Sequence, residues 1–175
     1  MDDIDRPIRR SYDGWATYDA RIREVVEQLS PEDLAIRPSP DRWPIWATVA
    51  HTAGVRVYWL CGVFGEPGAE ATPFPEVVSG VGWEDDPGTP RSAAELTIAL
   101  RSTWAIVERC LDRWTVAMLD EAFPARAATG GIRLHTRQSV LMRLLTHDAY
   151  HAGELSQTLG IHGLPQIDLW RSDDA

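Results

Sequence analysis

The sequence predicts an all-α protein, a four-helix bundle with a long connection between its second and third helices. Three observations support this fold class. Apolar residues recur at helical spacing in four segments of about 20 residues each. No convincing run of β-strands separates these segments. The 175 residues, 44% of them hydrophobic, suffice for one hydrophobic core, so we expect a single domain over residues 1–175.

The first helix is expected over residues 7–29, with a proline in its first turn, where proline is favoured. A short turn of helix follows from Ser30. The second helix fits residues 45–64 and ends at Gly65, because glycine readily adopts the left-handed conformation that follows a helix. Residues 65–90 form a connection rich in Gly, Pro and acidic side chains, which we expect to be mobile and to border a pocket or a partner chain.

The third helix begins at Ser92, where the sequence SAAE matches a capping box. A short helical piece is expected over residues 115–122, and residues 123–136 are irregular with a brief hairpin. The fourth helix starts near residue 136 or 139, runs to Leu159 and stops at Gly160. The four long helices should then pack through their apolar faces.

The composition excludes several classes of partner. The formal net charge is −9, and no basic cluster offers a surface for nucleic acid or for anionic membranes. No window approaches the roughly 18 apolar residues that a membrane-spanning helix needs. The N-terminal stretch MDDIDRPIRR lacks the apolar segment of a signal peptide, so we expect a cytoplasmic protein with reduced cysteines. All 17 basic residues are arginine, which indicates a gene rich in G and C.

The stretch THDAYHAGELSQTLGIHG contains the residues with the strongest chemical signal. On a helix, residues four apart lie about 40° apart around the axis and roughly 6 Å along it. His147 and His151 can therefore direct their rings to one point, with Glu154 on the same face. Apolar neighbours indicate that this face points to the core, where unpaired polar groups are costly and a metal ion would satisfy them. His51, inside the apolar second helix, is the best third ligand, although hydrogen-bonded core histidines remain the alternative.

Other candidates are weaker. The segment HDAYH is similar to the HExxH helix of zinc proteases, but Asp148 is one carbon shorter than the required base, and position 157 is glutamine where the extended motif has histidine. His135 and His162 fall in expected loops. Tryptophans in or near the second helix and the long connection are candidates for a pocket wall or for core packing; these are Trp43, Trp46, Trp59 and Trp83.

The segment LLTHDAYHAGELSQTLG, together with a long earlier helix that contains His51, resembles the DinB/YfiT-like superfamily. This resemblance covers nearly the whole chain and implies a four-helix bundle that binds one divalent metal ion, zinc or nickel, through three histidines. By that match the ligands are His51, His147 and His151. Characterised members of the superfamily include enzymes that transfer bacillithiol or mycothiol to electrophiles and one that isomerises maleylpyruvate with mycothiol.

The leading functional hypothesis is a metal-dependent thiol S-transferase, whose partners are a low-molecular-weight thiol such as mycothiol and a small electrophile. Three histidine ligands would leave an open position at which a thiol loses its proton. Glu154 would act as a base or orient a ligand imidazole, and Tyr150 would donate a hydrogen bond or pack in the core. A metal-dependent hydrolase and a non-enzymatic, metal-stabilised binding protein are the alternatives. A homodimer is compatible with each of them.

Overall fold

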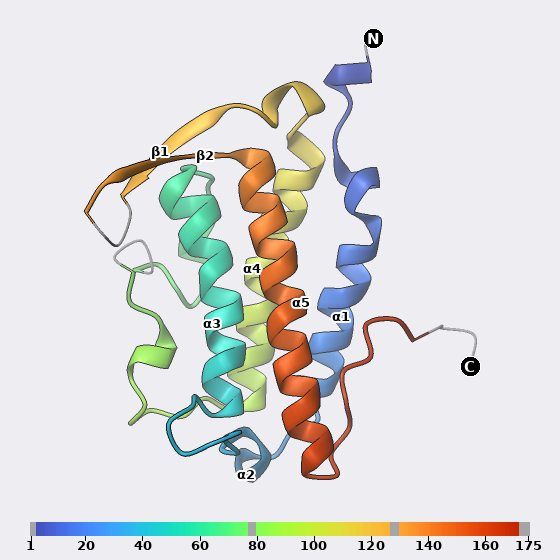
Figure 1. Ribbon diagram of the computed structural model, residues 1–175, viewed down its shortest axis with the longest axis vertical. Coiled ribbons are helices and arrows are strands. Elements are labelled where there is room, and N and C mark those ends of the chain that lie inside the picture. Colours follow the sequence, from blue (N-terminus) through green and yellow to red (C-terminus); the bar gives the residue numbers. More distant parts are fainter. Residues whose placement is uncertain (1–2, 77–79, 127–129, 172–175) are drawn as a thin grey trace.

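Four long helices lie side by side in the computed structural model, which describes residues 3–76, 80–126 and 130–171 (Figure 1). Their bounds are α1 (Asp13–Val26), α3 (Ile45–Val57), α4 (Ala93–Arg113) and α5 (Arg137–Ile161). The fold is mostly helical, as predicted, but the described residues also include a fifth short helix, α2 (Pro31–Leu34), and a small sheet. Within these ranges no helix is long and apolar enough to cross a lipid bilayer.

The first predicted helix is too long at both ends. Its first residues form the 3₁₀ turn η2 (Arg9–Tyr12), and α1 ends at Val26. The N–H of Ile8 donates to the carbonyl of Trp114 at 3.0 Å, which ties this segment to the end of α4. This long-range bond gives a partner to an N–H that would have none in the first turn of a helix.

The second predicted helix is confirmed in its extent but not in its geometry. After Val57 the backbone continues as the π-helix η3 (Tyr58–Val63). Gly65 ends it with a φ of 70°, the left-handed conformation expected of the terminating glycine. The π-helical turn widens the helix at its upper end in Figure 1, near the hairpin.

The predicted stop of the last helix at Gly160 is wrong, because α5 continues through Gly160 to Ile161. Gly163 has a φ of 71° instead, and its N–H donates to the carbonyl of Gly160 at 3.1 Å. The N–H of Leu164 donates to the carbonyl of Leu159 at 3.0 Å. These two bonds form a Schellman motif, in which the second of two available glycines ends the helix.

The predicted start of the third helix is confirmed. The Ser92 hydroxyl accepts from the Glu95 N–H, and the Glu95 carboxylate accepts from the Ser92 N–H at 2.9 Å. After α4, the 3₁₀ turn η7 (Val116–Met118) occupies part of the short helical piece expected there. The strands β1 (Ala122–Arg126) and β2 (Ile132–Thr136) then pair antiparallel. The predicted all-α fold class is therefore corrected, because the fold also contains this two-stranded sheet.

The helices α3 and α4 run in the same direction in Figure 1, so the connection between them returns along the length of the molecule. Part of this connection packs on the helices: Phe74 is buried, and its ring centroid lies 4.8 Å from that of Trp83 in the 3₁₀ turn η6 (Trp83–Asp85). The mobility expected for residues 65–90 stays a prediction, and residues 77–79 of that segment lie outside the described ranges.

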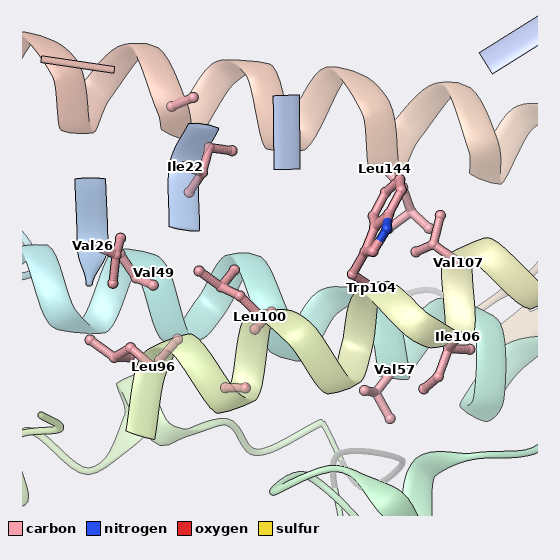
Figure 2. Close-up of a cluster of buried hydrophobic side chains, with 14 of the residues drawn as sticks. Ile22, Val26, Val49, Val57, Leu96, Leu100, Trp104, Ile106, Val107 and Leu144 are labelled. Atoms are coloured by element: carbon pink, nitrogen blue, oxygen red, sulfur yellow. The ribbon is translucent and has the colours of Figure 1, made fainter. Parts of the chain in front are cut away.

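The hydrophobic core lies between the long helices. Figure 2 shows aliphatic and aromatic side chains from all four meeting there. Helix α3 contacts both α4 and α5, which places its buried face at the centre of the core. The labelled members include Ile22 and Val26 of α1, Val49 and Val57 of α3, Leu96, Leu100 and Trp104 of α4, and Leu144 of α5.

Candidate metal centre

Three histidine rings meet between α3 and α5. The Nε2 atom of His147 lies 3.1 Å from that of His51 and 3.2 Å from that of His151. All three ligand atoms lie within 4.8 Å of one another. The residues that the sequence analysis singled out as ligands therefore come together from two helices, with His151 buried and the other two half-buried.

Two of the three separations between these atoms are close to those around a tetrahedral metal ion. Nitrogen ligands at roughly 2.0–2.1 Å from zinc are separated from one another by about 3.3 Å in a tetrahedral site. The two measured separations between Nε2 atoms, 3.1 and 3.2 Å, are close to that value. In the absence of an ion, a proton on Nε2 of His147 can be donated to only one of the other two Nε2 atoms, because His51 and His151, each with a carboxylate at Nδ1, offer lone pairs there.

The protonation states also suit metal binding. Burial, and then the neighbouring histidines His151 and His51, lower the pKa of His147 from 6.5 to about 3. Burial likewise lowers the pKa of His151, although Glu154 opposes this shift. Both rings are therefore neutral at physiological pH, which is the form that binds a metal ion.

Two carboxylates fix the orientation of two of the rings. Glu84 Oε1 lies 2.7 Å from Nδ1 of His51, and Glu154 Oε2 lies 2.7 Å from Nδ1 of His151. A carboxylate at Nδ1 selects the tautomer with a free Nε2 lone pair, as in many carboxylate–histidine–metal sites. This geometry supports the orienting role considered for Glu154, and it adds Glu84, which the sequence analysis did not single out.

Nδ1 of His147 is different, because this buried atom has no hydrogen-bond partner among the described residues. No carboxylate therefore orients the ring of His147 from its Nδ1 side. Its Nε2 atom lies between those of His51 and His151, so this ring contacts both of the others.

A buried ion network joins the helices that bear the histidines. Arg56 on α3 donates to Asp19 on α1 at 2.7 Å and to Asp148 on α5 at 2.8 Å. The indole N–H of Trp15 also donates to Asp148 at 2.8 Å. Asp148 directly follows His147 in the sequence, and Arg56 lies five residues after His51. The network therefore fixes the register of α3 against α5 at the level of the histidines.

Comparison with known proteins places this chain in a family. The sequence profile of the DinB superfamily matches residues 16–155. The chain belongs to the DinB superfamily. A crystal structure of a DinB-like protein from Bacillus cereus ATCC 10987 superposes with a TM-score of 0.68 at 19% identity, over 94% of this chain and 97% of that one. This likeness shows the fold. No curated protein matches the chain significantly.

Two cavities adjoin the histidines of this DinB-superfamily protein. The larger cavity, about 690 Å³, is lined by His151, Glu154 and Trp43, among others. The smaller cavity, about 350 Å³, is lined by His51, Glu84, Trp59 and neighbouring residues of α3 and the long connection. The ring centroids of His51 and His151 are 5.3 Å apart, so the histidine cluster has access to both cavities.

The remaining candidates divide between the cavities and the core. Trp43 and Trp59 line the cavities, whereas Trp46 is buried in the core. Tyr150 is 63% exposed, so it does not pack in the core, and a hydrogen bond to Glu154 raises the pKa of its hydroxyl. His135 and His162 were both expected in loops. His162 is the residue that caps the C-terminal end of α5, whereas His135 lies on the strand β2.

Proposed function

We propose that this DinB-superfamily protein is a metal-dependent thiol S-transferase whose divalent metal, zinc or nickel, is bound by His51, His147 and His151. The observation that supports it best is the convergence of three Nε2 atoms beside two cavities. Within the described ranges the group of ligand atoms is limited to these three histidines. Three protein ligands are typical of catalytic sites, in which a further position admits water or substrate.

When bound, a divalent metal would supply Lewis acidity and lower the pKa of a thiol in that further position. The residues of the chain prepare the site for it. Glu84 and Glu154 hold the rings of His51 and His151 with Nε2 directed at the centre. The two cavities offer separate spaces for a low-molecular-weight thiol, mycothiol first, and for an electrophile.

The position of Glu154 argues against the hydrolase in which this residue is the general base. Such a base would stand beside the attacking water. The Glu154 carboxylate is instead engaged by Nδ1 of His151 and by the hydroxyl of Tyr150. Nδ1 points away from Nε2 in an imidazole, so this carboxylate orients the ring on the side opposite the cluster.

The test is the rate of conjugation of mycothiol, and of other small thiols, to a generic electrophile such as chlorodinitrobenzene. Metal-loaded wild type and His162→Ala should accelerate it, whereas metal-free wild type and His151→Ala should not. Ionisation of a thiol with a pKa of about 8.5 contributes roughly tenfold at neutral pH, and positioning of both reactants adds to it. Equal conjugation rates for all four proteins would reject the proposal. If the metal-loaded protein instead hydrolyses an activated ester, the result would indicate the hydrolase.

A further inference from the structure

Two basic side chains contact the tryptophan that lines the smaller cavity. The guanidinium carbon of Arg143, on α5, lies 4.8 Å from the ring centroid of Trp59. The ring of His135, on β2, lies 4.8 Å from Trp59 between centroids, at an angle of 65°. The helix α5, the π-helix η3 and the hairpin thus each contribute one of these three side chains, of which Trp59 lines the cavity.

Arg143 has no carboxylate partner within the described ranges, although the chain has a net charge of −9. Arg143 is an exposed residue, and its described contact is stacking on Trp59. The positive charge of Arg143 is therefore held in place without being neutralised. By contrast, carboxylates pair with Arg9, Arg23, Arg56, Arg91, Arg113, Arg137 and Arg171.

The position of Arg143 relates it to the histidine cluster. It precedes His147 by four residues on α5, one turn of helix, or about 6 Å along the axis. The smaller cavity follows α3 from His51 to Trp59, eight residues that span about 12 Å. A small molecule in this cavity can therefore have one end at the histidines and the other at Trp59, the ring that the Arg143 guanidinium contacts.

We propose that Arg143, with Trp59 and His135, binds a carboxylate of the electrophilic substrate, which is thus a small organic acid. This inference rests on the proposed function, since it names the class of its second substrate. A guanidinium offers parallel N–H donors that match a carboxylate. The Trp59 ring limits the orientations of that guanidinium and excludes water from one face. His135 adds a ring N–H donor from the hairpin.

The experiment titrates zinc-loaded protein with malonate, succinate and glutarate and with the corresponding diamides. Binding is followed by NMR at the indole N–H of Trp59, assigned with Trp59→Phe. The test variant is Arg143→Gln. The matched control is Arg133→Gln, because Arg133 is an exposed arginine on β2 that also lowers the pKa of His135 but is not stacked on Trp59.

The diacids should bind the wild type with a preferred chain length, and the diamides should bind much more weakly. Arg143→Gln should weaken diacid binding by about tenfold, as expected for loss of one charge-assisted pair, and abolish the length preference. Arg133→Gln should change the affinity for the diacids by less than about twofold, the effect of a distant screened charge. Equal binding of acids and amides, no binding, or equal effects of the two substitutions would overturn the inference. These binding measurements use neither a thiol nor catalytic turnover. A failure of the proposed thiol transfer would therefore appear only in the conjugation assay, and a failure of this inference only in the titrations.

Discussion

Replacing Arg56 by methionine is expected to destabilise the protein and to weaken its metal site. The Arg56 side chain is fully buried and bonds to Asp19 on α1 and to Asp148 on α5. Methionine keeps much of the aliphatic volume but leaves both carboxylates in the core without this cation. Burial already raises the pKa of Asp148, and Arg56 is the main influence that lowers it, so Asp148 loses its principal stabilising partner.

Removing one partner of a buried ion pair costs about 3–5 kcal/mol, because the other charge stays buried without compensation. We expect the lower end, about 3 kcal/mol, because other donors to the two carboxylates remain. Asp19 keeps its bond from Arg23 at 2.7 Å, and Asp148 keeps the indole N–H of Trp15 at 2.8 Å. Domains are stable by about 5–15 kcal/mol, so the variant should still fold.

The assay is urea unfolding of metal-free protein, followed by metal competition with a chelator. Arg101→Met is the control, because Arg101 is an exposed residue of α4. The double variant Arg56→Met/Asp148→Asn should be more stable than Arg56→Met alone, because it removes the uncompensated charge. Metal affinity should fall in Arg56→Met and not in the control. A loss below about 1 kcal/mol, the usual value of a surface ion pair, would refute the reasoning.

Three further predictions follow from the geometry. Glu84→Ala and Glu154→Ala should each weaken metal binding by about 10–100-fold in chelator competition, because each frees Nδ1 of a histidine. Glu27→Ala, at the exposed residue that follows α1, should not. In metal-free protein the pKa of His147, about 3, lies below its ordinary value of 6.5, so the unfolded chain takes up protons that the folded chain does not. The free energy of unfolding should thus fall as pH decreases from 6.5 towards 3. One proton limits the slope to about 1.4 kcal/mol per pH unit, and solvent screening of the half-buried ring lowers it further. His147→Gln should flatten this slope in urea titrations at several pH values. Gly163→Ala should lower the melting temperature, since its φ of 71° costs an L-residue about 1 kcal/mol, whereas Gly153→Ala, with open space around its Cβ position on α5, should raise it; equal shifts would contradict the assignment of the helix end.

Helical periodicity predicted the long helices well, because each buries one continuous apolar face. Their ends were harder to predict. Gly160 and Gly163 are both plausible helix ends in sequence, and only the backbone shows that Gly163 takes the left-handed conformation. The brief hairpin expected within residues 123–136 is confirmed by the pairing of β1 with β2. The π-helical turn over residues 58–63 depends on tertiary packing, for which local sequence offers a weak signal.

The three histidines could be found from the sequence because two share a helix face and the third lies in an apolar helix. Glu84 could not, because it lies 33 residues from His51 in a connection where several acidic residues are equivalent in sequence. Arg56 had a usable signal, since a charged residue inside an otherwise apolar helix needs a buried partner. That partner, Asp148, is a structural residue of the core, in agreement with its exclusion as a protease base.

Metal content of the purified protein tests the central claim most directly. Elemental analysis after extensive dialysis should find about one divalent metal ion per chain in wild type and in His162→Ala. The variants His51→Ala, His147→Ala and His151→Ala should each lose most of it, because two histidines rarely retain a metal ion against dialysis. Wild type that binds no divalent metal when zinc or nickel is supplied, or full retention in the three histidine variants, would contradict the account.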